Sequence, residues 1–147
     1  MSTLRWAKAE LLHFAWRRGR YTPPDRRLLE EEILPALAAD PEVQRVLSVG
    51  VAWYTARYPS FFSGKSFATV DIDSTRASFG GEPHVVGDVR DLERHFAVDH
   101  VFDAVLLNGV IGYGLNDRDD VDRALRSCAA RLRTGGTLVI GINEEKP

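Results

Sequence analysis

The sequence predicts an α/β fold with a doubly wound, mostly parallel sheet of about five strands. Its short hydrophobic runs are apolar along their whole length, which is typical of parallel strands buried on both faces. These runs alternate with stretches of helical character, as in folds whose helices cover both sides of a sheet. The length of 147 residues, with 44% hydrophobic and 27% charged side chains, fits one folded domain rather than a disordered chain.

Five segments have the pattern of buried strands. They are 45–50 (RVLSVG), 67–72 (FATVDI), 84–87 (HVVG), 102–107 (FDAVLL) and 137–142 (TLVIGI). Helical segments are expected between them, near 55–62, 74–79, 90–97 and 119–133. We expect Asp73 to cap the second of these. Asn116 or Asp117 should cap the last helix, and Gly135 with Gly136 should end it.

Residues 1–40 have a different pattern and are expected to form a helical arm or lid, separate from an α/β domain at 41–147. A first helix begins around Leu4 and ends near Gly19. A second is expected to begin at Thr22, followed by two prolines, and Pro35 should kink or split it.

Composition excludes several classes of function. The net charge of −2 gives no general attraction to nucleic acid or to membranes. The single cysteine, Cys128, excludes an internal disulfide framework and a cysteine-based zinc site, and its place on the apolar stripe of helix 119–133 indicates packing. The four histidines have no metal-ligand spacing, so no metal is expected. No leader segment opens the chain, so we expect a cytoplasmic protein.

Two acidic side chains follow strands of the predicted sheet. Ligands of open parallel sheets bind at the carboxyl ends of the strands. Asp71 ends the second strand and can accept hydrogen bonds from both hydroxyls of a ribose. Asp88 follows the third strand and can accept from an exocyclic amine such as that of adenine. The alternative for either residue is the capping of the short helix that follows it.

Several segments resemble, in order and spacing, the motifs of class I S-adenosylmethionine (SAM) methyltransferases. They are VLSVGVAWYT, TVDIDSTRASFG, HVVGDVRDL, FDAVLLNGVIGYGL and RLRTGGTLVIGIN, within residues 43–143. The resemblance implies SAM as cofactor, with Asp71 on the ribose, Asp88 on the adenine amine and Asn108 beside the sulfonium. Further cofactor contacts implied by the resemblance are Gly50, Trp53, Ile72, Val89 and Gly109.

The chain departs from that family at two places. The glycine-rich first loop usually begins with an acid, whereas here Ser48 stands in that position and Ala52 and Tyr54 replace glycines. Trp53 and Tyr54 should therefore reshape or fill the pocket for the methionine part of the cofactor. The family also has two further strands after the fifth, which leaves strand 137–142 as an open edge. Either the chain is truncated or, as we expect, a partner polypeptide supplies the missing strands.

The resemblance implies an enzyme that transfers a methyl group to a small molecule, in bacterial antibiotic or other metabolite biosynthesis. Tyr54, Asn108 and Tyr113 are the candidate catalytic residues, which would line the reacting end under the N-terminal arm. One alternative is displacement without SAM, because the chain is similar to two-component proteins that close aziridine rings in azinomycin-type biosynthesis, with loss of a group such as sulfate. The other is a scaffold subunit without catalytic activity. Neither a nucleic-acid substrate nor a membrane is expected.

Overall fold

The structure is a computed structural model that describes residues 11–12 and 14–143. The chain divides into two compact units, one ending at Ala39 and the other beginning at Asp40. The start of the expected first helix, at Leu4, lies outside the described residues. The part that is described is helical as far as residue 17, and Gly19, with φ +69°, closes it as expected.

The helices of the first unit are α2 (Pro24–Leu28), a π-helical segment η1 (Leu29–Ile33) and α3 (Leu34–Ala39). The N-cap is Pro23, with no side-chain hydrogen bond, so Thr22 is not the capping residue. The backbone N–H of Leu34 donates to the Leu29 carbonyl, five residues earlier. Since a proline ring clashes with the carbonyl four residues before it, the wider π turn directly ahead of Pro35 is the interruption that the sequence predicts.

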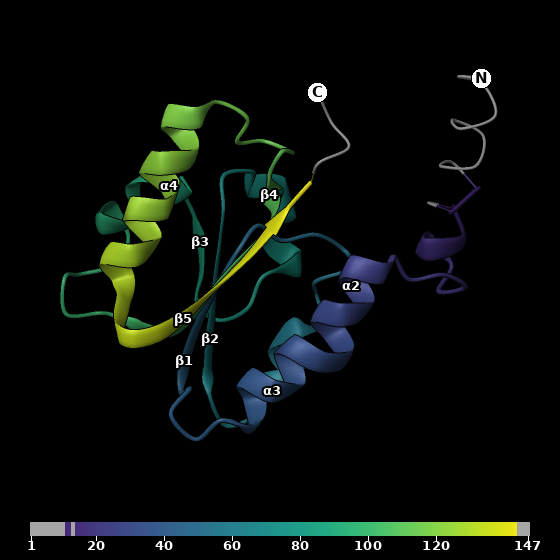
Figure 1. Ribbon diagram of the computed structural model, residues 1–147, viewed down its shortest axis with the longest axis horizontal. Coiled ribbons are helices and arrows are strands. Elements are labelled where there is room, and N and C mark those ends of the chain that lie inside the picture. Colours follow the sequence, from purple (N-terminus) through teal and green to yellow (C-terminus); the bar gives the residue numbers. More distant parts are fainter. Residues whose placement is uncertain (1–10, 13, 144–147) are drawn as a thin grey trace. The chain divides into compact units, whose positions relative to one another are not determined.

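The second unit contains a five-stranded parallel sheet in the order β3-β2-β1-β4-β5 (Figure 1). The strands are β1 (Arg45–Val49), β2 (Ser66–Asp71), β3 (His84–Val86), β4 (Phe102–Ile111) and β5 (Leu132–Ile142). The predicted fold class is confirmed, with the first three strands placed to within a residue or so. The last two are longer than predicted, because their polar and glycine residues also join the sheet.

One face of this sheet is covered by α4 (Arg118–Arg131) and by the 3-10 segment η4 (Val89–Arg94). Ala124 and Cys128 of α4 are fully buried in the core there, as expected of the cysteine. The hydroxyl of Ser127 accepts from the backbone N–H of Leu92, 2.9 Å away, and Arg131 Nε donates to the Phe96 carbonyl at 3.0 Å. The first bond fixes η4 against α4, and the second fixes the turn that follows η4.

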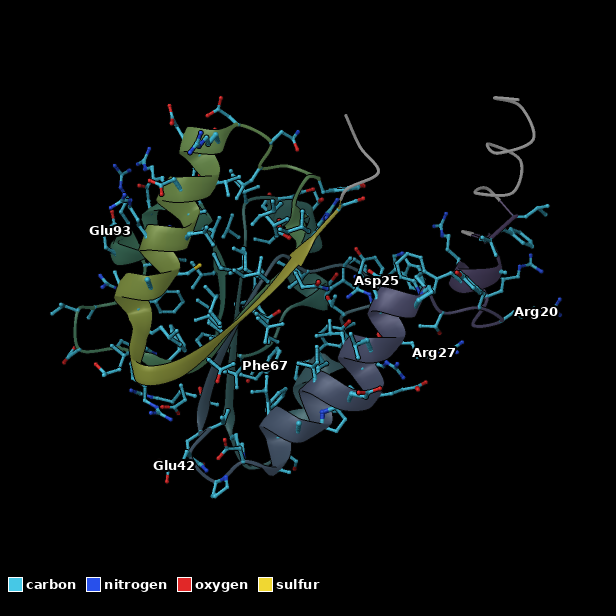
Figure 2. The ribbon with its side chains drawn as sticks, viewed as in Figure 1. Arg20, Asp25, Arg27, Glu42, Phe67 and Glu93 are labelled. Atoms are coloured by element: carbon cyan, nitrogen blue, oxygen red, sulfur yellow. The ribbon has the colours of Figure 1, made fainter. Side chains whose placement is uncertain are left out.

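The three other expected helices are 3-10 segments: η2 (Tyr58–Phe62), η3 (Ser74–Phe79) and η4, which is kinked at Asp91. Such segments are short because their hydrogen-bond geometry is poorer than that of an α-helix. Asp73 caps η3 as predicted, accepting from Thr75 N at 2.9 Å, and the Thr75 hydroxyl and N–H lower the pKa of the Asp73 carboxyl. The Phe62 ring of η2 stacks on Phe67 of β2, labelled in Figure 2, with 5.1 Å between ring centroids.

The end of α4 differs from the prediction. Asp117 caps its start as expected, but the helix ends at Arg131 and β5 begins at the next residue. Gly135 and Gly136 therefore lie inside β5, within a bulge that shifts its register against β4. Gly135 has φ +77°, and a Cβ on Gly136 would stand 2.9 Å from the Asp103 carbonyl oxygen. The two glycines therefore allow the bulge in β5 and do not end the helix.

β5 is an edge strand. Among the described residues no strand pairs with its outer side, and none of its residues is fully buried. Ile140 is 43% and Ile142 64% exposed. The structure thus has an exposed strand edge with apolar side chains, as the sequence predicts. In the described part of the chain, no helix has the length and apolar character that crossing a bilayer requires.

Candidate functional site

A cavity of about 390 Å³ lies at the carboxyl ends of β1, β2, β3 and β4 in the second unit. Its volume falls within the usual range of small-ligand pockets, about 300–1,000 Å³. Parallel strands bring all their carboxyl ends to one edge, and neighbouring crossovers leave a crevice there. Seven of the residues predicted for the site line it: Gly50, Asp71, Ile72, Asp88, Val89, Gly109 and Tyr113.

Asp71 joins the second strand to the first loop. It is 8% exposed, and its Oδ2 accepts from the backbone N–H of Val51 while Oδ1 accepts from that of Asp73, both at 2.8 Å. An ionised carboxylate offers about four acceptor positions, so two remain for ligand hydroxyls. Asp71 does not cap η3, since Asp73 does so. The structure therefore removes the capping alternative for Asp71 and leaves its carboxylate beside the cavity.

Gly50 is required by the turn that follows β1. Its φ is +81°, which is costly for residues with a side chain, and its N–H donates to the Val70 carbonyl at 2.8 Å. A Cβ at this position would lie only 3.1 Å from Val110 Cγ2. The loop after β1 lines the cavity at Gly50.

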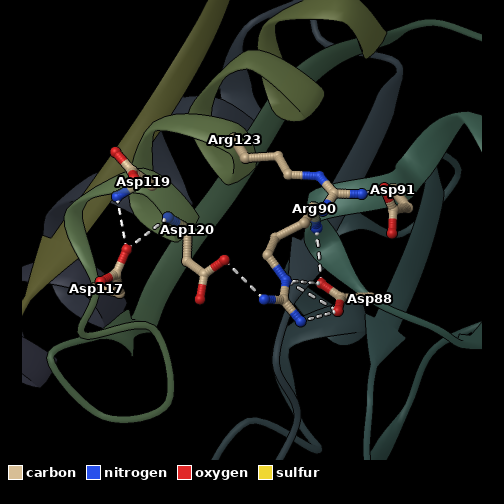
Figure 3. A network of polar contacts seen from close by, with 7 residues as sticks. All are labelled: Asp88, Arg90, Asp91, Asp117, Asp119, Asp120 and Arg123. Carbon is tan, nitrogen blue, oxygen red and sulfur yellow. Dashed lines mark hydrogen bonds and ion pairs between the residues drawn. The ribbon is translucent and has the colours of Figure 1, made fainter.

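Asp88, predicted to face an adenine amine, is engaged by Arg90 (Figure 3). Oδ1 accepts from Arg90 N at 2.9 Å and from Nε at 3.0 Å; Oδ2 lies 3.0 Å from Nε and 2.5 Å from Nη2. These bonds lower the pKa of the Asp88 carboxyl and raise that of the Arg90 guanidinium. Asp88 therefore caps η4, as the alternative for it predicts, and it also lines the cavity.

Arg90 is in turn held by α4. Its Nη1 donates to Asp120 Oδ1 at 2.8 Å, and Asp117 caps the same turn of α4 by accepting from the backbone N–H groups of Asp119 and Asp120 (Figure 3). A second ion pair, between Arg123 of α4 and Asp91 of η4, lies next to it. The cavity wall at Asp88 is thereby tied to the amino end of α4.

The cavity combines apolar walls with charged groups. Ile72 is 69% and Tyr113 57% exposed although both line the cavity, so they present open apolar surface to a ligand. Arg76 also lines it, with Nη1 3.5 Å from the Val51 carbonyl and Nε 3.4 Å from Asp73 Oδ2. A flat, partly apolar ligand with hydroxyl and amine donors suits this lining. The described residues contain no cluster of acidic, histidine or cysteine side chains able to hold a metal ion.

Three predicted site residues are not among those that line the cavity. Trp53 and Tyr54 lie edge to face, with 5.2 Å between their ring centroids, in the loop after β1. Asn108 pairs with Gly141 in the sheet, and a Cβ on Gly141 would approach Asn108 Oδ1 to 1.7 Å. The Asn108 amide therefore lies against β5, which is possible only because residue 141 is a glycine.

Sequence reasoning missed Arg76 and Arg90 as lining residues. Each follows an acid of a strand end by two to five positions, but arginines on short helical segments are more often solvated. Their role depends on partners in other elements, above all Asp120, which is 30 residues from Arg90 in the chain. No local pattern reveals that pairing.

Comparison with known proteins places this geometry in a known fold. The sugar N-methyltransferase KedS8 from Streptoalloteichus superposes on 87% of the chain with a TM-score of 0.61 and 27% identity. CalS10, a SAM-bound amino pentose methyltransferase from Micromonospora echinaspora, covers 92% with a TM-score of 0.61 and 21% identity. The chain has the class I methyltransferase fold. This methyltransferase-like chain spans 52% of KedS8 and 58% of CalS10.

The sequence is also similar to that of a methyltransferase. The ribosomal RNA small subunit methyltransferase C of Chromohalobacter salexigens is 32% identical over 146 residues, which include 88% of this methyltransferase-like chain and 40% of the relative. No protein-family model matches the chain.

Proposed function

We propose that this chain is a SAM-dependent methyltransferase, or the cofactor-binding part of one, and that it methylates a small molecule. The observation that carries the proposal is the buried Asp71 carboxylate, which opens onto a cavity of about 390 Å³ at the strand ends. The fold of KedS8 and CalS10, both described as methyltransferases, supports it.

The lining of the cavity suits the nucleoside half of this cofactor. Asp71 would accept from the ribose hydroxyls and Asp88 from the adenine amine, while Ile72 and Val89 would contact the base. Gly50 and Gly109 would allow the backbone to approach. When bound, SAM supplies an electrophilic methyl group on a sulfonium. The chain's own contribution is to hold the reactants in line and exclude water, for which no catalytic triad is needed.

An amine of a small metabolite is the acceptor that we propose. KedS8 is described as a sugar N-methyltransferase, and CalS10 as an amino pentose methyltransferase involved in calicheamicin biosynthesis. Tyr113, exposed at the cavity, would face the acceptor. Tyr54, Asn108 and Trp53, which are not among the residues that line the cavity, remain predictions for the reacting end.

A partner polypeptide is the second part of the proposal. In the part of the chain that the structure describes, no strand pairs with the outer side of β5, and Ile140 and Ile142 are exposed there, which suits an added strand. Two measurements test this: native mass spectrometry of the chain purified alone gives its oligomeric state, and hydrogen exchange gives the protection of the β5 amides. A stable monomer whose β5 amides are as protected from hydrogen exchange as those of β1 would contradict it. Rapid exchange of β5 that slows with a co-purified partner would support it.

Isothermal titration calorimetry with SAM and with S-adenosylhomocysteine tests cofactor binding. We expect micromolar dissociation constants for the chain with any required partner, and a large loss in Asp71→Ala. The matched control is Asp103→Ala, which also removes a carboxylate that accepts two backbone N–H groups, but at the opposite ends of the strands. Equal losses in the two variants would mean that binding is lost through folding.

The same experiments address the alternatives. Absence of SAM binding in the assembled protein would favour displacement without SAM, with Asp71 as the candidate base. An unchanged reaction rate of the Asp71→Ala complex would favour a scaffold role.

Ribosomal RNA is the second candidate acceptor, because the sequence relative is named for that substrate. Transfer of labelled methyl groups to ribosomal RNA rather than to amino sugars would favour it over a small molecule.

A further inference from the structure

One wall of the cavity is formed by the end of β4 and the turn after it, residues 109–115, which we call the β4 turn. The residues of this segment that line the cavity are Gly109, Val110, Tyr113, Gly114 and Leu115. The segment folds back on itself, because the backbone N–H groups of Gly114 and Leu115 both donate to the Val110 carbonyl, at 3.0 and 3.1 Å. The position of the β4 turn therefore determines this side of the cavity.

The β4 turn is attached to the carboxyl end of β5, which lies beside the end of β4 (Figure 1). The backbone N–H of Asn143, directly after β5, donates to the Ile111 carbonyl at 3.1 Å. Gly112 has φ +81°, and a Cβ at this position would overlap the carbonyl oxygen of Asn143. A side chain at position 112 is thus opposed both by the backbone conformation and by the backbone of residue 143.

A second contact that requires a glycine lies on the other side of the register shift between β4 and β5. Asn108 of β4 pairs with Gly141 of β5, and its Oδ1 occupies the space that a Cβ of residue 141 would need. At Gly112 the contact is between two backbones, with no flexible side chain to absorb a movement. A displacement of the end of β5 must therefore move the β4 turn as well.

The end of β5 is paired on one side. Among the described residues no strand pairs with its outer edge, and Ile142 is exposed there. Segments with few buried contacts open locally at a lower cost in free energy than the core of a fold. The support of the β4 turn is thus a segment that can open while the rest of the sheet stays folded.

We infer that Gly112 is a positioning residue through which the end of β5 holds the β4 turn in place, so that order at the end of β5 and ligand binding in the cavity strengthen each other. The inference rests on the proposed function, since S-adenosylhomocysteine is the ligand that tests it. A ligand that needs the β4 turn in place binds only while the end of β5 is paired. Bound ligand must in return suppress the opening of β5, because such coupling is reciprocal.

Calorimetry with S-adenosylhomocysteine, on the chain with any required partner, compares two glycine variants. In Gly112→Ala we expect affinity to fall by about tenfold or more, because the new Cβ drives residues 112 and 143 apart. The matched control is Gly135→Ala in the bulge near the start of β5. Its φ is also positive, +77°, but the one atom within contact of its Cβ would be Arg133 Nη1 at 3.6 Å. Both variants should unfold at a lower temperature, but only Gly112→Ala should lose affinity. Equal affinities would overturn the inference.

Hydrogen exchange of the Asn143 amide measures the coupling in the opposite direction. The ligand is added at about a hundred times the dissociation constant of each protein, so that both are equally saturated. We expect the amide to exchange about tenfold or more slowly in the wild type, and at a nearly unchanged rate in Gly112→Ala. Global stabilisation by the ligand would slow the amide equally in both proteins, and that result would contradict the coupling. An Asn143 amide that bound ligand does not slow in the wild type would contradict it too.

A second pair of variants decides the matter if Gly112→Ala does not fold. Asn143→Pro removes the N–H that donates to Ile111, whereas Asn143→Ala removes the side chain and keeps that N–H. We expect the proline variant to bind S-adenosylhomocysteine about threefold or more weakly than the alanine variant. Equal affinities, with the wild type binding normally, would overturn the inference alone. A wild type that binds no S-adenosylhomocysteine would overturn the proposed function, and the inference with it.

Discussion

The two ends of the sheet use the same chemistry for different purposes. At the carboxyl ends, Asp71 accepts two backbone N–H groups beside a cavity. At the amino ends, Asp103 of β4 accepts the N–H groups of Gln44 and Arg45 through Oδ2, both at 2.8 Å, and Arg133 Nε donates to its Oδ1 at 2.7 Å. Asp103 ties β1, β4 and β5 together and is not among the residues lining the cavity.

The difference between these sites is the space beside the carboxylate. Burial alone would raise the pKa of Asp103, but the two backbone N–H groups and Arg133 outweigh it, so the pKa is lowered. Those donors occupy acceptor positions of the Asp103 carboxylate. Among the described residues Asp71 has hydrogen-bond partners from the backbone alone, two N–H groups, and it lines the cavity. A buried, hydrogen-bonded aspartate therefore indicates a ligand site only where a cavity adjoins its remaining acceptor positions.

The largest expected effect is that of Asp71→Ala on ligand affinity. Loss of charge-assisted hydrogen bonds to ribose hydroxyls should weaken S-adenosylhomocysteine binding by about ten- to a hundredfold. Calorimetry measures this at a temperature where thermal unfolding shows the variant to be folded. Unchanged affinity would show that Asp71 does not contact the ligand. Asp71 and Asp103 would then not differ in the way described above.

Asp103→Ala should act on stability instead. Two backbone N–H groups and Arg133 lose their acceptor, which should lower the free energy of unfolding by about 1–3 kcal/mol. Urea unfolding monitored by circular dichroism gives this value. Ligand affinity below the unfolding transition should match that of the wild type, and a loss as large as in Asp71→Ala would contradict the division of roles.

The pH dependence of the free energy of unfolding should also show that the Asp103 carboxylate stabilises the fold. Because the folded-state pKa of Asp103 is lowered from 3.8, its stabilising contribution is fully present above about pH 5 and is lost as pH falls through the folded-state value. The difference in unfolding free energy between wild type and Asp103→Asn, about 1 kcal/mol at pH 7, should therefore shrink between pH 5 and pH 2. A difference that grows on acidification would show that the carboxylate destabilises the fold.

The smallest effect concerns the core between the two ends. Burial raises the pKa of the Cys128 thiol to about 12, so almost no thiolate is present at pH 8. In the native protein a thiol reagent should react with Cys128 only at the rate of unfolding, and in urea at once. Fast labelling of the native protein would mean that the packing of α4 on the sheet opens readily.

The sequence was most informative where a residue's surroundings follow from its neighbours in the chain. Apolar runs located the strands, and Asp71 and Gly50 were placed by the rule for strand ends. It was least informative where the outcome depends on a distant partner. Arg90 acquires its role from Asp120, and Asn108 turns toward Gly141 rather than the cavity. Gly135 and Gly136 have the pattern of a helix end but belong to a bulge, because β5 continues back past them to Leu132.

The outer side of β5, with which no described strand pairs, also bears on how the protein is made. A strand that can accept a foreign segment can equally accept the same strand of another copy, and this self-association rises with concentration. Synthesis together with the proposed partner polypeptide would shorten the time during which another copy can pair with β5 beside Ile140 and Ile142. The yield of folded protein should therefore be higher after joint than after separate expression, because the partner and a second copy compete for the same backbone hydrogen-bonding groups of β5.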